Sequence, residues 1–210
     1  MPDIMQSPPL LDHFGVAVGA LTGVLAARGR KVDLFGVLVL ALVTAFGGGS
    51  LRDLLTGDTP VAWLRSPHLF YTACGTALVS FVVCRSWDPP ASLLQIADAF
   101  ALAFFAIVGA RKGLDHDFAA PVAVMLGVIT GVAGGILRDV LTGSVPLVFR
   151  QDTYYYATAA TIGCVAYCML RGVTGDEIAA WAGVATTVII RLCAIRYRLS
   201  LPAFESRDAA

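Results

Sequence analysis

One glycine-rich sequence of ten residues, with an Arg-Asp pair inside it, occurs twice in this chain. The copies cover residues 48–57 and 134–143, an offset of 86 residues, and nine of the 14 positions from Gly48 to Val61 are identical to their counterparts. Both copies lie in apolar runs. Charge and loosened backbone are costly in hydrocarbon, so we expect these residues to line a cavity. One such site in each half is typical of repeat-built membrane transport proteins.

The chemistry that these residues suit is passage of a dehydrated cation. Each glycine at 47–49 costs up to about 1 kcal/mol in a helix, so we expect a kink or unwinding that exposes carbonyl oxygens to a dehydrated cation. Close packing of helices through small residues explains the glycines, taken alone, at least as well. The candidate pore and gate residues are Gly47, Gly48, Gly49, Ser50, Arg52, Asp53, Gly134, Gly135, Arg138 and Asp139.

The duplicated charges predict contacts between the two halves. Adjacent helix residues do not face each other, so we expect Arg52 to pair with Asp139 and Arg138 with Asp53. Such crossed pairs would neutralise four charges within the membrane and hold the two broken helices together. The alternative is that both pairs lie at the membrane surface and extend to water.

Other polar residues are weaker candidates. Asp12 and Asp98 stand at matched segment starts, where helix capping explains them and a cation-attracting vestibule is the second interpretation. Arg111 and Lys112 are interpreted as anchors at the membrane surface. The cysteines and histidines show no metal or nucleophile spacing, so we expect no enzymatic activity, no cofactor and no metal beyond a transient monovalent cation.

The composition indicates an all-α integral membrane protein. The chain is 57% hydrophobic and 14% charged, whereas soluble domains carry about 25% charged residues. Its formal net charge is zero, which gives no indication of nucleic-acid binding. Seven apolar segments approach the ~20 residues that cross a bilayer. They cover residues 11–28, 34–56, 69–84, 94–112, 119–142, 155–171 and 177–195.

The offset of 86 residues extends beyond the motif and divides the chain into two units. We predict a single membrane domain over residues 1–210, and three spans per unit force the second unit to cross the membrane in the opposite direction. Its parts are a first three-helix repeat at 11–84, an inverted second repeat at 94–171, a seventh helix at 177–195 and a polar tail at 200–210.

Basic residues in the loops predict the orientation. With the N-terminus outside and the C-terminus cytoplasmic, nine basic residues fall inside and four outside. The inner set is Arg28, Arg30, Lys31, Arg85, Arg150, Arg191, Arg196, Arg198 and Arg207, and the outer set is Arg65, Arg111, Lys112 and Arg171. We therefore expect a multi-pass membrane protein with its N-terminus outside and its C-terminus cytoplasmic.

The chain resembles the prokaryotic trimeric intracellular cation (TRIC) channel family, formerly an uncharacterised family of duplicated three-span units. Residues 33–37, 44–53, 105–112 and 134–139 carry the resemblance. It implies a homotrimer in the lipid of the bacterial inner membrane, with an hourglass pore inside each subunit that is lined by kinked second and fifth spans. The motif glycines would form the waist of that pore, which would pass monovalent cations with K⁺ favoured.

The sequence and the resemblance together support two candidate functions. The first is a K⁺-permeable cation channel. The second is a secondary transporter of a small amino acid such as glycine, because some related bacterial sequences carry that label. In that case Arg52 or Arg138 would bind the substrate carboxylate. A structural scaffold would explain the small residues but not the duplicated charges.

Overall fold

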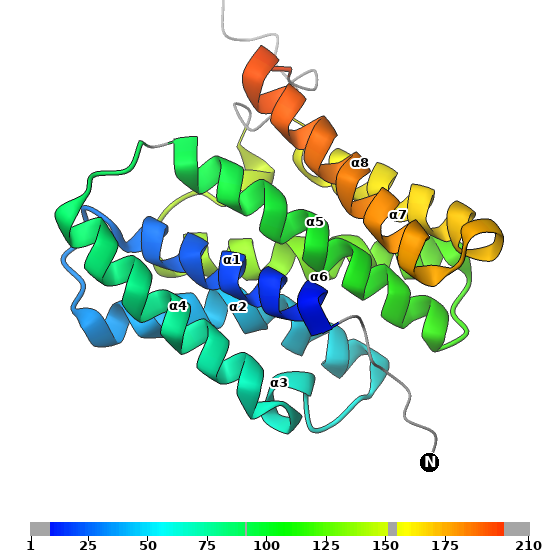
Figure 1. The fold of residues 1–210 in the computed structure, drawn as a ribbon, viewed down its shortest axis with the longest axis horizontal. Helices are drawn as coiled ribbons and strands as arrows, with labels where there is room; N and C mark the ends of the chain where they lie inside the picture. Colours follow the sequence, from blue (N-terminus) through cyan, green and yellow to red (C-terminus); the bar gives the residue numbers. More distant parts are fainter. Residues whose placement is uncertain (1–8, 91, 151–154, 200–210) are drawn as a thin grey trace, which may run out of the picture.

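The computed structural model describes residues 9–90, 92–150 and 155–199, and all regular structure within them is helical. The long helices are α1 (Pro9–Ala27), α2 (Leu34–Thr56), α4 (Pro67–Ser86), α5 (Ser92–Asp115), α6 (Ala120–Leu141), α7 (Tyr156–Thr174) and α8 (Asp176–Tyr197). Two short elements that the sequence did not predict follow α2 and α6, namely α3 (Ala62–Arg65) and the 3-10 helix η1 (Leu147–Phe149). The helices form one bundle (Figure 1).

The all-α membrane protein is confirmed. Among the described residues, six helices from α2 to α8 are long and apolar enough to cross a membrane, while the apolar part of α1, Asp12–Ala27, is shorter. The number of seven spans stays a prediction. The polar tail at 200–210 lies outside the described residues.

A left-handed glycine ends both motif-bearing helices. Gly57 follows α2 with φ 74° and Gly143 follows α6 with φ 64°, a conformation that costs glycine little. The residue after each glycine donates its backbone N–H to the motif aspartate's carbonyl, Asp53 or Asp139, at 2.8 Å in both copies. The last residue of the repeated sequence is therefore a helix stop.

The motif glycines bring α2 and α6 into backbone contact. A Cβ on Gly48 would overlap the carbonyl oxygen of Thr130, and a Cβ on Gly134 would overlap that of Thr44. The two contacts are equivalent in the repeat, because Gly134 follows Gly48 by 86 residues and Thr130 follows Thr44 by 86 residues. Both helices continue unbroken through their glycines, so the expected unwinding is wrong. Each helix keeps its hydrogen bonds because the neighbouring backbone fills the space that side chains would occupy.

Equivalent glycine contacts also join each motif helix to the helix before it, α1 to α2 and α5 to α6. A Cβ on Gly23 of α1 would lie 2.6 Å from the Cα of Ala41 on α2, and a Cβ on Gly109 of α5 would lie 2.9 Å from the Cα of Gly127 on α6. Ala41 and Gly127 are again 86 residues apart. Small residues thus set the close approach of helices within each half.

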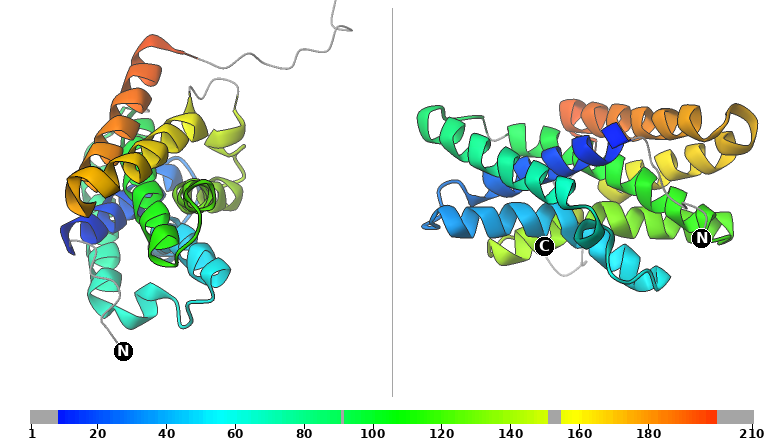
Figure 2. Two further views of the ribbon diagram at one scale, coloured as in Figure 1. Left: turned by 90° about the vertical axis from the view of Figure 1, so that its right-hand side faces the viewer. Right: turned by 60° about the horizontal axis from the view of Figure 1, so that its bottom comes forward.

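Each half has its own apolar core, and α8 belongs to the second. One core joins residues of α1, α2 and α4, and the other joins residues of α5, α6, α7 and α8. In Figure 1, α8 and α4 lie on opposite sides of the bundle, and Figure 2 shows α8 along one face. Helix α8 packs on α5 and α7, so the second half carries a cover that the first half lacks.

Candidate functional site

A cavity of about 580 Å³ lies beside the first motif copy, between α1, α2, the α3–α4 region and α5. Exposed residues such as Pro60 and Arg65 form part of its lining, so it reaches the protein surface. Four carboxylates and four basic groups line it, and the formal charges cancel. They are Asp12, Asp53, Asp58, Asp115, Arg52, Arg65, Arg111 and Lys112.

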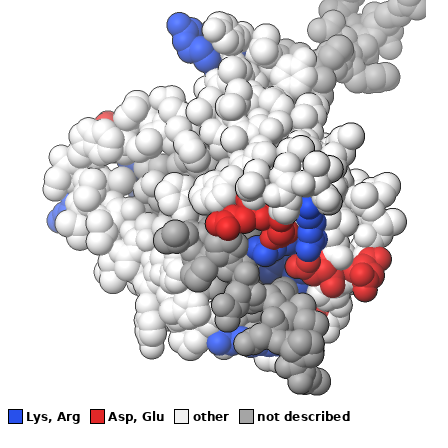
Figure 3. All heavy atoms as spheres, turned by 45° about the vertical axis from the view of Figure 1, so that its right-hand side comes forward, with Lys and Arg blue, Asp and Glu red and all other residues white. Residues whose placement is uncertain are grey.

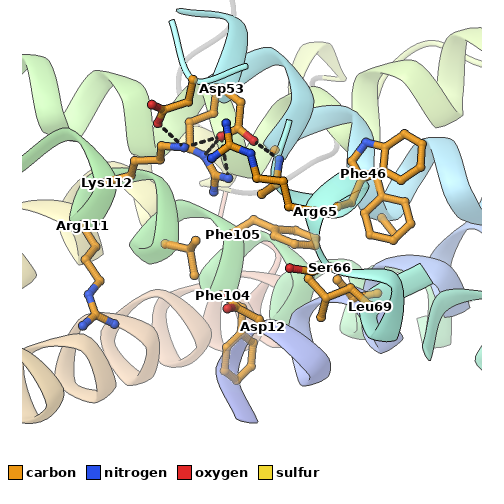
Figure 4. Close-up of a pocket in the computed structure, with 18 of the residues that line it drawn as sticks. Asp12, Phe46, Asp53, Arg65, Ser66, Leu69, Phe104, Phe105, Arg111 and Lys112 are labelled. Atoms are coloured by element: carbon orange, nitrogen blue, oxygen red, sulfur yellow. Dashed lines mark hydrogen bonds and ion pairs between the residues drawn. The ribbon is translucent and has the colours of Figure 1, made fainter. Parts of the chain in front are cut away.

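The ammonium group of Lys112 sits between two carboxylates in this lining. Its Nζ lies 2.6 Å from Oδ1 of Asp53 and 2.6 Å from Oδ2 of Asp58. Figure 4 shows Lys112 and Asp53 pointing toward each other across the cavity wall, from α5 and α2. The Lys112 side chain is buried, so the prediction of a surface anchor is wrong. Its charge is neutralised by aspartates 59 and 54 residues earlier, which one segment's sequence cannot reveal.

Asp58 holds a second partner at the rim of the cavity. The His116 ring places Nε2 3.1 Å from Oδ2 of Asp58 and Nδ1 2.9 Å from the carbonyl oxygen of Lys112. Partial burial works to raise the pKa of the Asp58 carboxyl, but the hydrogen bond and charge of Lys112, with a smaller contribution from His116, lower it below the ordinary value. Asp58 is therefore held as a carboxylate.

Arg52 pairs with its own neighbour. Its Nε lies 2.9 Å from Oδ1 of Asp53, and its Nη2 lies 2.8 Å from the same oxygen. In the second copy, Nε of Arg138 lies 2.8 Å from Oδ1 of Asp139. The predicted crossed pairs are wrong. The Cβ atoms of adjacent helix residues point in different directions, and the prediction depended on this. The arginine side chain is long enough to fold back and reach the carboxylate of the next residue.

The side chain of each motif aspartate also accepts a backbone hydrogen bond from the segment that follows its helix. Oδ2 of Asp53 accepts the backbone N–H of Ala62 at 2.7 Å, and Oδ2 of Asp139 accepts that of Leu147 at 2.9 Å. These bonds position α3 and η1 against the ends of α2 and α6. The Arg-Asp pair therefore shapes both halves in the same way.

The second motif copy is sealed rather than open. The Arg138 side chain is 0% exposed, and besides Asp139 it reaches Asp98, whose Oδ1 lies 2.8 Å from Nη1. Asp98 is itself buried, seven residues into α5, so neither helix capping nor a vestibule describes it. Its counterpart Asp12 does line the cavity of the first half.

Two residues from α7 and α8 complete this buried group. A Cβ on Gly135 would lie 3.3 Å from the hydroxyl oxygen of Tyr156 and 3.5 Å from Oδ1 of Asp98, so both groups face the glycine. The guanidinium carbon of Arg191 lies 4.7 Å from the centroid of the Tyr156 ring. Arg191 is 1% exposed and lies within α8, so its charge does not belong in the count of basic residues that predicts the orientation.

The other predicted site residues divide between packing and lining. A Cβ on Gly47 would lie 2.6 Å from Cδ1 of Leu137, so Gly47, like Gly48, serves the contact between α2 and α6. Gly49 lines the cavity. Ser50 accepts a hydrogen bond from Nε1 of Trp63 at 3.1 Å, which ties α3 to α2.

Ion pairs join α5 to α7 and α8 near the cavity. Nη2 of Arg111 lies 2.5 Å from Oδ2 of Asp176, and Nη2 of Arg171 lies 2.6 Å from Oδ1 of Asp115. In Figure 3, acidic and basic side chains gather in one region of a face that is otherwise largely uncharged. Arg111 is therefore a structural cation of the cavity wall as well as a residue near the surface.

Sequence reasoning missed the roles of Lys112, Asp58, Tyr156 and Arg191. A signal existed for two of them. Lys112 is one of only two lysines in the chain, and Arg191 interrupts the apolar run Val188-Ile189-Ile190 before Leu192. A lone cation in an apolar helix indicates a buried partner more often than a loop. Asp58 and Tyr156 carried no comparable signal.

Comparison with known proteins agrees with this two-part architecture. The family model described as "Glycine transporter" matches residues 9–85 and again residues 95–172. The UPF0126 membrane protein of Vibrio cholerae is 43% identical over 197 residues, covering 93% of this chain and 82% of its own. The chain belongs to the UPF0126 family of membrane proteins. The UPF0126 inner membrane protein YadS of Escherichia coli K12 is 41% identical, covering 92% of this chain and 94% of its own.

Solved structures relate this UPF0126 protein to the TRIC channels. The TRIC trimeric intracellular cation channel orthologue from Rhodobacter sphaeroides superposes with a TM-score of 0.85 at 34% identity, covering 91% of this chain and 98% of its own. A structure described as the basis for conductance through TRIC cation channels gives a TM-score of 0.84 at 32% identity, covering 97% of this chain and all of its own. The resemblance to the TRIC family is confirmed.

Proposed function

We propose that this UPF0126 protein is a monovalent-cation channel, permeable to K⁺, with a pore inside each subunit of a homotrimer. The observation that carries the proposal is the position of Lys112. Its ammonium is a monovalent cation that two carboxylates, Asp53 and Asp58, hold at 2.6 Å in the wall of the 580 Å³ cavity. A K⁺ ion that displaced the ammonium would meet the same carboxylates.

The proposed path follows the faces of α2 and α6 that carry Gly49 and Gly135. It does not run directly between the two helices, because Gly48 and Gly134 bring their backbones into contact. Gly49 lines the cavity, and Gly135 faces the buried group of the second half at the matched position. The pore thus passes beside the helix crossing, toward α1 and α5.

The pairing of the arginines is compatible with cation passage. A free arginine in the path would repel cations, but Arg52 is held by Asp53 and Arg138 by Asp98 and Asp139. The solved relatives with TM-scores of 0.84 and 0.85 are described as cation channels, which supports the same function here.

We propose the orientation with the N-terminus outside and the C-terminus cytoplasmic. Leaving the buried cations Arg191 and Lys112 and the partly buried Arg111 out of the loop counts keeps the excess of basic residues on the cytoplasmic side. The cavity then opens to the outside, because the start of α1 and the ends of α2 and α5 line it.

Transport of glycine is the second candidate. The cavity lining combines four carboxylates with four basic groups, and such a lining suits a zwitterion as well as a cation. Flux into proteoliposomes separates the two. A channel passes K⁺ under an imposed voltage without need of glycine, whereas a transporter shows saturable glycine uptake driven by an ion gradient and little current. Glycine uptake without K⁺ conductance would overturn the channel proposal.

A further inference from the structure

The two halves of the protein carry the same motif in opposite states. The first copy borders a cavity that reaches the surface, and we call this the open end, formed by the start of α1 and the ends of α2 and α5. The second copy is packed shut at what we call the closed end, formed by the starts of α5 and α7 and the ends of α6 and α8. From Asp98 to Lys112, α5 spans about 21 Å between them at 1.5 Å per residue.

A cation that enters at the open end must therefore pass the closed end to cross the protein. The described side chains there are Asp98, Asp139, Arg138, Tyr156 and Arg191, and each is at most 5% exposed. Their two carboxylates and two guanidinium groups cancel in formal charge. Three of the five, Asp98, Arg138 and Asp139, correspond by the offset of 86 residues to residues that line the open cavity.

Arg191 is the member of this group that the repeat does not supply. Asp98, Arg138 and Asp139 have counterparts in Asp12, Arg52 and Asp53, all of which line the open cavity. Arg191 comes from α8, which belongs to neither repeat and packs on α5 and α7. It lies over the Tyr156 ring at 4.7 Å and is 1% exposed.

We propose that Arg191 is the plug that closes the ion path at this end. This inference rests on the proposed channel function. The fixed charge of Arg191 repels a cation, and its side chain covers the Tyr156 ring at 4.7 Å, where the first half has no equivalent arginine. Withdrawal of Arg191 would hydrate the group around Gly135 and leave Asp98, Asp139 and Arg138 with a net charge of minus one.

Two buried atoms of the group fit a closed state that can open. Oδ2 of Asp98 and Nη2 of Arg138 have no hydrogen-bond partner among the residues that the structure describes. Unpartnered buried polar atoms are costly, and water entering an open path would satisfy both. The closed arrangement is therefore not held by complete hydrogen bonding.

Two substitutions on α8 test the proposal. Arg191→Ala removes charge and bulk, and we expect the K⁺ flux into proteoliposomes to rise by roughly tenfold, with a higher ratio of K⁺ to Cl⁻ permeability. Arg196→Ala is the matched control, because Arg196 lies on the same helix but is exposed. It should leave both values unchanged. If the alanine variant does not fold, Arg191→Gln, which keeps most of the volume, is measured instead.

A labelling experiment keeps the test independent of conduction. In a chain whose five cysteines are replaced by alanine, Gly49→Cys places a thiol in the cavity, where a Cβ meets only Nη2 of Arg52 at 3.8 Å. A charged, membrane-impermeant thiol reagent should modify it from the open end alone. With Arg191→Ala added, it should react from the closed end as well.

The outcomes separate the plug from the channel. Increased flux and closed-end labelling in the Arg191 variant support the plug. Closed-end labelling with no K⁺ flux in any variant supports the plug and overturns the channel. A folded Arg191 variant with unchanged flux and no closed-end labelling overturns the plug, whatever the wild-type flux.

Discussion

Nζ of Lys112 lies 2.6 Å from Oδ1 of Asp53, and this contact joins α5 to the first copy of the motif on α2. The two residues are 59 positions apart in the chain. Asp53 also accepts from Arg52 and from the Ala62 N–H, so one carboxylate organises the cavity wall, the motif and the loop. In the proposed channel, a cation in the cavity would meet this carboxylate.

Replacing Lys112 should increase cation passage. Lys112→Gln removes the ammonium from between Asp53 and Asp58, and we expect the K⁺ current at fixed voltage to rise by roughly tenfold, which corresponds to about 1.4 kcal/mol. Lys31→Gln is the matched control, because Lys31 is exposed and is the chain's other lysine. Equal currents in both variants, recorded in planar bilayers, would count against a role for Lys112.

The glycines at the helix crossing should tolerate no side chain. Gly48→Ala places a methyl group against the Thr130 carbonyl, and overpacking of this kind costs about 1–3 kcal/mol. Gly75→Ala on α4 is the control, since nothing lies within 4 Å of its Cβ position, and it should gain about 0.5–1 kcal/mol. Thermal unfolding in detergent compares them, and a Gly48 variant as stable as the Gly75 variant would refute the close contact.

The two motif arginines should differ in their effect on stability. Arg138→Ala leaves buried Asp98 and Asp139 without their arginine and should cost about 3–5 kcal/mol. Arg52→Ala should cost less, because Asp53 keeps Lys112 and the Ala62 N–H. Thermal unfolding of the two variants measures the order, and the reverse order would contradict the closed second half.

Double-mutant cycles test the pairing itself. Arg138 and Asp98 should show a coupling energy of about 0.5–3 kcal/mol, whereas Arg52 and Asp139 should be additive within about 0.5 kcal/mol. The free energies of unfolding of the single and double alanine variants supply both values. A strong coupling between Arg52 and Asp139 would restore the crossed pairs expected from the sequence.

Acid should weaken the contact at the rim of the cavity. The pKa of Asp58 is lower in the folded protein than its ordinary value of 3.8, so its contribution is present above that value and is lost as the pH falls through the folded pKa. Asp58→Asn should therefore destabilise the protein by up to about 1 kcal/mol at neutral pH, and the gap from wild type should narrow in acid. Asp117→Asn, at an exposed carboxylate, is the control for thermal unfolding across pH. A gap that does not change with pH would exclude this role of Asp58.

The sequence predicted the elements better than the contacts. The bounds of α2 at 34–56 are those expected, because an apolar run lies between a capping residue, Asp33, and a left-handed glycine, Gly57. The amino-acid sequence alone indicates the repeat, the membrane character and the charged motif. Local rules failed at the arginines, whose length lets them reach a neighbour that their Cβ does not face.

Long-range partners could not be predicted from spacing. Lys112 meets Asp53 only because α5 packs beside α2, and Arg191 meets Tyr156 only because α8 covers the second half. Offset matching locates residues within each repeat, but it says nothing of a helix that has no counterpart. That helix supplies Arg191, which has no counterpart in the first half.

The reversal potential of single-channel currents across a KCl gradient tests the central claim most directly. With purified protein in a planar bilayer, we expect unitary currents that reverse near the K⁺ equilibrium potential, with K⁺ passing in preference to Cl⁻ because Asp53 and Asp58 face the proposed path. Unitary currents that reverse near the Cl⁻ equilibrium potential would contradict this expectation, as would a bilayer that stays silent both with folded wild-type protein and with the folded Arg191→Ala variant.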